Sequence, residues 1–137
     1  MSGLVLDCSV AISWCFEDEA AAETDALLHR VRDEGASVPA LWRWEVANVL
    51  LTAMRRGRIT AGEAHARLTL PGALPIATDA EGPSRAWREA LLLAQIHGLT
   101  AYDAAYLELA LRLNVPLATK DADLMRAASA MGLQAIP

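Results

Sequence analysis

Cysteine and histidine are scarce in this chain of 137 residues, which has two cysteines and three histidines. Cys8 and Cys15 stand seven positions apart, a spacing that fits neither a redox CxxC pair nor a zinc cluster. We expect both thiols to be small core residues. We expect His29, His65 and His97 at the surface or at helix ends, because they fall on separate helical segments without the close spacing of metal ligands.

The chain also lacks a long apolar run, a signal peptide and an excess of positive charge. Its longest apolar stretches are about half a membrane span. The start MSGLVLDCSV has neither the cationic segment nor the long apolar middle of a signal peptide, so we expect a cytoplasmic protein without a membrane partner. The formal net charge of −5 excludes a broadly basic nucleic-acid-binding surface. The densest basic cluster, RRGR at 55–58, either complements the dipole at the end of a helix or contacts RNA locally.

Disorder is excluded by the composition of the chain. Hydrophobic residues make up 54% and charged residues 21% of the sequence, and neither a low-complexity tract nor a repeat is present. We expect residues 1–137 to fold as one domain with a sizeable core. A composition this apolar also leaves apolar side chains at the surface, where a partner can bind.

Short strand patterns alternate with longer helical patterns, which predicts an α/β fold with a mainly parallel sheet covered by helices. Ser9 can cap the first helix, and Thr60 and Glu63 have the spacing of a capping box. Pro71 and Gly72 are expected to end the helix that Thr60 begins. Strands are expected at 3–7, 37–40, 74–78, 116–119 and 133–136, and helices at 10–16, 20–35, 41–57, 60–70, 84–98, 100–114 and 121–132.

Four acidic residues stand where strands or apolar helices begin or end: Asp7, Glu45, Asp103 and Asp121. Asp7 closes the apolar run GLVLD and Asp121 follows PLATK, so both are expected at the carboxyl ends of parallel strands, where such sheets bind ligands. Glu45 shares a helix face with Asn48, and the apolar residues of that helix lie on a different face. The helix can therefore bury one side and present Glu45 to a cleft.

Each acid also has an ordinary structural explanation. Asp103 stands three residues after the expected helix cap Thr100, where a carboxylate is worth ~0.3–1 kcal/mol against the helix dipole, and Asp121 can itself cap a helix. Asp7 is harder to explain in this way, because a carboxylate at the end of a buried strand loses water and needs a compensating partner. Apart from Lys120, the sequence places no cationic side chain beside these acids.

A divalent cation is the natural compensation for such carboxylates. Two unit charges ~4 Å apart interact by ~4 kcal/mol at an effective dielectric of about 20, so clustered carboxylates either take up protons or bind metal. Oxygen ligands suit Mg²⁺ or Mn²⁺ rather than Zn²⁺. A metal of this kind can activate water and stabilise the charge that develops on an attacked phosphorus. The pattern therefore suggests a metal-dependent nuclease.

The order and spacing of these residues resemble the PIN domain, and within it the VapC-type ribonuclease toxins of bacterial toxin–antitoxin pairs. The similarity extends over the whole chain, and the four motifs together make a signal that none of them makes alone. The matching segments are LVLDCS with Asp7 and Ser9, EVANVL with Glu45 and Asn48, TAYDAAYLELA with Asp103, and LATKDADL with Asp121.

The resemblance implies a PIN-like three-layer α/β/α sandwich and an endoribonuclease that uses Mg²⁺ or Mn²⁺. It further implies RNA as the substrate, a cognate antitoxin protein as partner and a homodimer as the assembly. Four acids carry over from the family as metal ligands and catalytic residues: Asp7, Glu45, Asp103 and Asp121.

Further residues are candidates for supporting roles at such a site. Asp123 is a ligand candidate of second rank, because Asp121 rather than Asp123 follows Thr119 at the spacing expected from the family. Ser9, Asn48 and Thr119 are candidates for hydrogen bonds that orient the ligands. For the two hydroxyls, helix capping or satisfaction of a strand end is an equally good interpretation.

Two other functions stay open at this point. In an aspartyl-phosphate phosphotransferase, Asp7 would be the nucleophile and Lys120 would bind phosphate. Ser9, however, stands where a common phosphatase pattern has a second aspartate. The other alternative is a non-catalytic PIN-like module that binds a metal or a partner. Incubation of RNA with Mg²⁺ or Mn²⁺, with and without EDTA, distinguishes all three.

Four tryptophans beside a single phenylalanine are an unusual composition. Trp14, Trp42 and Trp44 fall on helices near the proposed cleft, and Trp87 falls on a later helix. Core packing is the default interpretation. A groove for a partner and stacking with RNA bases are the alternatives.

Overall fold

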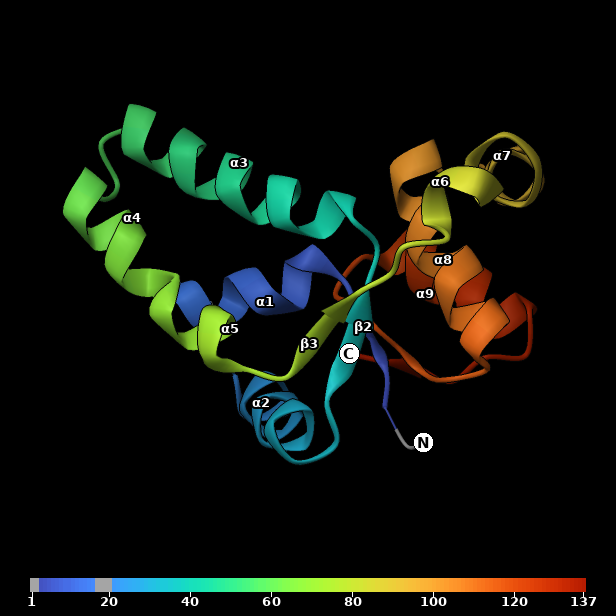
Figure 1. Ribbon diagram of the computed structural model, residues 1–137, viewed down its shortest axis with the longest axis horizontal. Coiled ribbons are helices and arrows are strands. Elements are labelled where there is room, and N and C mark those ends of the chain that lie inside the picture. The colour runs from blue at the N-terminus through green and yellow to red at the C-terminus, as the bar shows by residue number, and fades with distance from the viewer. Residues whose placement is uncertain (1–2, 17–20) are drawn as a thin grey trace.

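Five short strands form one parallel sheet in the computed structural model of the chain, which describes residues 3–16 and 21–137 (Figure 1). The strands are β1 (Val5–Leu6), β2 (Ala36–Val38), β3 (Ile76–Thr78), β4 (Leu117–Ala118) and β5 (Ala135–Ile136). Their order across the sheet is β3-β2-β1-β4-β5, and every adjacent pair is parallel. At the centre, Val5 of β1 pairs with Ser37 of β2 on one side and with Leu117 of β4 on the other.

Helices cover both faces of the sheet, so the predicted three-layer α/β/α fold is confirmed (Figure 1). The segments before β3 supply α1 to α5 and the segments after it supply α6 to α9, on opposite sides of the strands in Figure 1. Among the described residues, no helix combines the length and the apolarity needed to cross a membrane. The helices are α1 (Cys8–Cys15), α2 (Ala22–Glu34), α3 (Leu41–Arg55), α4 (Ala61–Arg67), α5 (Thr69–Ala73), α6 (Gly82–Arg85), the π-helical turn η2 (Ala86–Ala90), α7 (Leu91–His97), α8 (Ala101–Leu113) and α9 (Ala122–Ala130).

The chain reverses its direction across the sheet at β1, which creates a topological switch point. From β1 it moves outward through β2 to β3, and it then crosses back to β4 on the other side of β1. In doubly wound sheets, ligands bind outside the carboxyl ends of the strands at such a point. Asp7 directly follows β1 and Thr119 directly follows β4, so the topology brings these two residues to that edge.

The centre of the sheet is fully buried, because helices cover both of its faces. α8 packs against both β1 and β4. Its middle section, from Ala104 to Ala110, is largely buried, so α8 is a fixed base for the residues of its first turn. Side chains of these elements with no more than 1% exposure include Val5, Leu6, Ala104, Tyr106, Leu107, Leu109, Ala110, Leu117 and Ala118.

The predicted helix break at Pro71 and Gly72 is wrong. The helix that begins after Thr60 ends earlier, at Arg67, and both residues fall inside α5. Pro71 is tolerated because it lies in the first turn of α5, where its missing N–H would have no intrahelical acceptor. The predicted capping box of Thr60 and Glu63 is confirmed by reciprocal hydrogen bonds of 3.0 and 3.1 Å.

Two other helices begin at positions that differ from the predictions. The helix predicted over 84–98 already begins at Gly82 and includes the π-helical turn η2. Pro83 favours this earlier beginning, because its fixed φ suits the first turn of a helix. Ala20, where the second helix was predicted to begin, lies outside the described residues, and α2 begins at Ala22.

Arg112 connects α8 to the loop that follows β3. Its guanidinium donates hydrogen bonds of 2.9 and 2.8 Å to the two carboxylate oxygens of Asp79, and two of 2.9 Å to Glu108. Hydrogen bonds from Arg112 lower the pKa of Asp79 below its ordinary value. Bidentate pairs of this kind are stronger than neutral hydrogen bonds and fix geometry. Arg112 therefore holds α8, which carries Asp103, against the end of the sheet.

Replacing Asp79 with asparagine should destabilise the fold by about 2 kcal/mol at neutral pH, because charge-assisted hydrogen bonds to Arg112 are weakened. The folded-state pKa of Asp79 is lowered, so its stabilisation is fully present above the unfolded value of 3.8 and is lost as pH falls through the folded value. Urea unfolding of wild type and Asp79→Asn at neutral and acid pH measures this difference, which should shrink in acid.

Glu81→Gln is the matched control for this experiment. Glu81 also approaches Arg112, at 3.7 Å, but its side chain is 63% exposed, so water screens the pair. We expect Glu81→Gln to change stability by less than about 0.5 kcal/mol. If Asp79→Asn costs no more than this control, Arg112 does not hold α8 in the way described.

Candidate functional site

Asp7 is a buried carboxylate at the carboxyl end of β1, with 6% of its surface exposed. Its Oδ2 atom accepts hydrogen bonds from Ser9 Oγ at 2.8 Å and from Thr119 Oγ1 at 2.7 Å. The predicted cap by Ser9 is wrong, because α1 begins at Cys8 with Asp7 in the cap position and the Ser9 hydroxyl donates to Asp7 instead. Burial raises the pKa of Asp7, and the two hydroxyl hydrogen bonds oppose this rise.

Ser9 and Thr119 connect the end of β1 to the turn that follows β4. The Thr119 side chain is fully buried, and its hydroxyl accepts a hydrogen bond of 3.0 Å from the backbone N–H of Asp121. The Ser9 hydroxyl likewise accepts one of 2.9 Å from the backbone N–H of Lys120. Each hydroxyl therefore donates to Asp7 and accepts from the turn, which fixes the position of Asp7 relative to Asp121.

α3 contributes Glu45 from the side of the helix that the core does not bury. The buried side chains of α3 include Val46, Leu50 and Ala53, whereas Glu45 is half-buried and Asn48 is exposed. The predicted division of this helix into two faces is confirmed. The same helix therefore packs against the core and presents Glu45 and Asn48 outside it.

Tyr106 of α8 donates a hydrogen bond from its hydroxyl to Oε1 of Glu45. Burial raises the pKa of Glu45, and the negative charges of Asp7 and Asp103 act in the same direction. The hydrogen bond from Tyr106 opposes this rise. Glu45 therefore lies within electrostatic reach of acids from β1 and α8.

Asp103 lies in the first turn of α8. Its backbone N–H donates a hydrogen bond of 3.0 Å to Thr100 Oγ1, which confirms Thr100 as the helix cap. Burial raises the pKa of Asp103, and the negative charges of Asp121 and Asp7 raise it further. A hydrogen bond with the Thr100 side chain opposes this rise.

Asp121 is the N-cap of α9, as the structural explanation predicted. Its Oδ1 atom accepts hydrogen bonds from the backbone N–H of Asp123 at 2.8 Å and of Leu124 at 3.1 Å. Asp123 itself is exposed and pairs with Arg126 at 2.8 Å. Because Asp123 already has a cationic partner, it is less suited than Asp121 to receive a metal ion.

The four predicted acids come together electrostatically at one edge of the sheet, where each of Asp7, Glu45 and Asp103 responds to charges of the others. Within residues 3–16 and 21–137, none of the four forms a salt bridge with a lysine or arginine. In that same part of the chain, however, no three His, Cys, Asp or Glu side chains are close enough to enclose a metal ion. The four acids therefore lie within electrostatic reach of one another, but they do not surround a metal-sized space in this arrangement.

The oxygen atoms that these carboxylates leave available are compatible with a divalent cation. Side-chain hydrogen bonds to Asp7 converge on Oδ2, Tyr106 occupies Oε1 of Glu45, and both backbone amides at Asp121 occupy Oδ1. The second oxygen of each of these three carboxylates accepts no side-chain hydrogen bond from the described residues. Anionic oxygens held by hydrogen bonds on one side are the ligands that Mg²⁺ and Mn²⁺ prefer.

Tyr106 is the residue that the sequence analysis missed. It stands three residues after Asp103, so the helical spacing i, i+3 places both on neighbouring positions of one helix face. That spacing in TAYDAAYLELA was an available signal. The sequence does not predict that Glu45 accepts a hydrogen bond from Tyr106, because Glu45 is 61 positions away in the chain.

Core packing describes only one of the four tryptophans fully. Trp42 is buried, and Trp14 is half-buried with its Nε1 donating a hydrogen bond of 2.8 Å to the carbonyl of Thr24. Trp44 and Trp87 are both largely exposed, so the default interpretation is wrong for them. Trp44 follows Trp42 by two positions, about 200° around α3, and therefore points away from the core.

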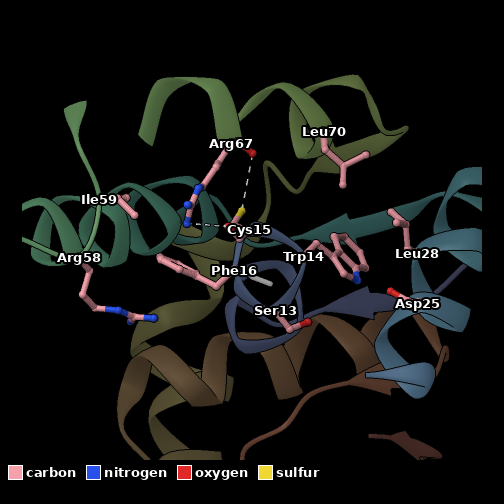
Figure 2. A pocket seen from close by; sticks show the side chains of 10 residues that line it. All are labelled: Ser13, Trp14, Cys15, Phe16, Asp25, Leu28, Arg58, Ile59, Arg67 and Leu70. Atoms are coloured by element: carbon pink, nitrogen blue, oxygen red, sulfur yellow. Dashed lines mark hydrogen bonds between the residues drawn. The ribbon is translucent and has the colours of Figure 1, made fainter. Parts of the chain in front are cut away.

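A pocket of about 720 Å³ lies at the end of α1 opposite to Asp7 (Figure 2). Phe16 is at its centre, with the guanidinium carbons of Arg58 and Arg67 at 4.6 and 5.1 Å from the ring centroid. Arg67 also donates a hydrogen bond of 3.2 Å to the carbonyl of Cys15, as Figure 2 shows. None of the four predicted acids lines this pocket, so it is separate from the candidate site.

A doubly wound parallel sheet with acids at its switch point defines an α/β protein whose ligand site lies at that edge. Comparison with known protein families identifies which family of α/β proteins this chain belongs to. Residues 4–130 match the PIN domain, and the chain belongs to the PIN domain family. PIN domains are typically metal-dependent nucleases.

Solved structures of other proteins share the fold of this chain. PAE2754 from Pyrobaculum aerophilum is similar with a TM-score of 0.72 and 23% identity, over 98% of this chain and 91% of that one. FitAcB from Neisseria gonorrhoeae is similar with a TM-score of 0.61 and 19% identity, over 98% of this chain and 96% of that one. Identities this low support the fold alone. Among curated proteins, no sequence matches the chain significantly.

Replacing Asp103 with asparagine should stabilise the metal-free protein at neutral pH. The folded-state pKa of Asp103 is raised, so its contribution to stability is fully present below the unfolded value of 3.8 and is lost as pH rises through the folded value. We expect Asp103→Asn to melt higher than wild type in EDTA at neutral pH, by roughly 3 °C if about 1 kcal/mol is gained. Melting curves at neutral pH and below 3.8 measure the effect, which should vanish in acid.

Asp33→Asn is the control for this measurement, because Asp33 is exposed on α2 and the chemical change is the same. It should leave the melting temperature nearly unchanged. A lower melting temperature for Asp103→Asn in EDTA would mean that the carboxylate acts as a favourable helix N-terminal charge, and that the acids do not repel one another appreciably.

Proposed function

We propose that this chain is a Mg²⁺- or Mn²⁺-dependent endoribonuclease, and that it is the VapC-type toxin of a type II toxin–antitoxin pair. Membership of the PIN family supports the nuclease class. The finer statement, that the substrate is RNA and the role is that of a toxin, rests on the resemblance of the four sequence motifs to that group. We further propose that residues 1–137 form one PIN-like domain that works in the cytoplasm.

The observation that carries the proposal is the buried Asp7 carboxylate. It lies at the switch point of the sheet with hydroxyls on one oxygen, and other acids rather than a cation lie within electrostatic reach. A carboxylate in such a place is costly unless a positive charge compensates it. A divalent cation would compensate the charge of Asp7 and would also bind the RNA phosphate.

Asp7, Glu45, Asp103 and Asp121 are the residues that would hold this cation. When bound, a divalent metal supplies an activated water and neutralises charge on the attacked phosphate. The chain's own part is to orient the ligands: Ser9 and Thr119 hold Asp7, and the first turn of α9 holds Asp121. Asn48 stays a candidate for contact with the substrate or the ligands, one turn beyond Glu45, and Asp123 stays a ligand candidate of second rank.

One observation favours a second candidate function. The described acids do not close around a point as they stand, which suits a non-catalytic PIN-like module that binds a partner. The phosphotransferase alternative is not retained. Its nucleophile would be Asp7, but Ser9 stands where a common phosphatase pattern has a second aspartate, and the Ser9 hydroxyl donates to Asp7.

Asp7→Asn and Asp103→Asn should each lower metal-dependent RNA cleavage by at least about a hundredfold, the scale expected when one electrostatic stabiliser is removed. Cleavage of cellular RNA in Mn²⁺, with EDTA as the blank and circular dichroism as the folding control, measures this loss. Asp33→Asn is the matched control and should cleave like wild type. Sequencing the new RNA ends identifies the substrate at the same time. Wild-type cleavage by a folded Asp7→Asn protein, or cleavage that EDTA does not stop, would remove the acids from the mechanism.

A cognate antitoxin should mask the candidate site. It is expected to offer a cationic side chain to the unpaired carboxylates and apolar side chains to exposed residues such as Trp44. Co-expression with the product of the adjacent reading frame should yield a complex that no longer cleaves RNA. Light scattering of the purified chain tests the proposed homodimer. A chain that is harmless when expressed alone, cleaves no RNA and binds nothing would contradict the toxin role.

A further inference from the structure

Tyr106 and Glu45 form a contact between two helices that are far apart in the sequence. Tyr106 comes from α8 and Glu45 from α3, at a separation of 61 positions in the sequence. The tyrosine is fully buried, at 0% exposure, while the carboxylate that it meets is only half-buried. The hydroxyl therefore lies at the boundary between the core and the candidate site.

The hydroxyl of Tyr106 has no use in packing alone. A phenylalanine would fill the same volume without bringing a polar group into the core, where an unpaired hydroxyl is costly. The Tyr106 hydroxyl meets this requirement by donating to Oε1 of Glu45. A tyrosine at this position is explained by the carboxylate that it holds.

The contact also determines how Glu45 faces the other acids. Glutamate has three side-chain torsions and can adopt many orientations, and an interaction at one oxygen restricts them. With Oε1 engaged by Tyr106, Oε2 is the oxygen left without a side-chain hydrogen bond from the described residues. Tyr106 stands one helical turn after Asp103, so the same turn of α8 supplies one acid and holds another.

We propose that Tyr106 is a positioning residue that holds Glu45 in a single orientation, with Oε2 toward Asp7 and Asp103, and thereby prepares Glu45 to bind a divalent cation. This inference rests on the proposed function. Tyr106 touches neither metal nor substrate in this role and acts only through Glu45. A residue that orients a metal ligand by a hydrogen bond typically changes metal affinity by about 10–100-fold when it is removed.

The test is a double-mutant cycle on the affinity for Mn²⁺, measured by electron paramagnetic resonance on the purified full chain. Tyr106→Phe should weaken Mn²⁺ binding about tenfold or more. In the Glu45→Gln background, Tyr106→Phe should cause little further loss, because the residue through which it acts has already been changed. RNA cleavage by the same proteins provides a second readout.

Tyr102→Phe is the matched control, because Tyr102 stands one turn earlier on α8 and is 66% exposed. It should leave Mn²⁺ affinity unchanged. It also makes Tyr106 the sole tyrosine, since the chain has two. The tyrosine doublet in the Raman spectrum of Tyr102→Phe should then report a strong hydrogen-bond donor, and adding Glu45→Gln should change it. This measurement needs no substitution at Tyr106 and so does not depend on how well Tyr106→Phe folds.

The outcomes separate this inference from the function on which it rests. If wild type neither binds Mn²⁺ nor cleaves RNA, both are overturned. If wild type binds Mn²⁺ and cleaves RNA, and Tyr106→Phe binds Mn²⁺ equally well, the proposed function stands and the positioning role is overturned. The positioning role is also overturned if Tyr106→Phe weakens Mn²⁺ binding by the same factor with and without Glu45→Gln. It is likewise overturned if Glu45→Gln leaves the tyrosine Raman doublet unchanged.

Discussion

A carboxylate buried at the end of the central strand is the constraint on which the rest of the site depends. Asp7 cannot be hydrated freely where it lies, so its charge has to be stabilised by groups that the fold supplies. The hydroxyls of Ser9 and Thr119 do this from the two sides of the switch point. Because Thr119 and Lys120 follow β4, the same contacts join β1 to β4, its neighbour in the sheet.

The ionised acids of the site also destabilise the fold, and packing of the core has to offset this loss of stability. Burial raises the pKa values of Asp7, Glu45 and Asp103, and mutual repulsion adds to it. Several acids with raised pKa values in one place are a common feature of functional sites. Here the ion pairs of Arg112 lie elsewhere, on the opposite end of α8, where they stabilise the helix whose first turn carries Asp103. α8 therefore has stabilising ion pairs near its C-terminus and a carboxylate with a raised pKa in its first turn.

The sequence predicted the architecture and the positions of the acids well, because both depend on local patterns. The alternation of strands and helices predicts a parallel sheet, and the rule for its carboxyl ends predicts where Asp7 and Asp121 emerge. It predicted less well what depends on contacts between distant segments. Ser9 looked like a helix cap because local spacing allowed it, but its hydroxyl donates to Asp7. Tyr106 lies among apolar residues in TAYDAAYLELA, and only the three-dimensional packing brings it to Glu45.

The most direct test of the central claim is a crystal structure of the chain grown or soaked in Mn²⁺, with anomalous scattering used to locate the metal. We expect a Mn²⁺ peak at the carboxyl end of β1, with oxygens of Asp7, Glu45, Asp103 and Asp121 as its protein ligands or held to it through water. A fully occupied Mn²⁺ site elsewhere, or a structure in saturating Mn²⁺ with no metal between these acids, would contradict it.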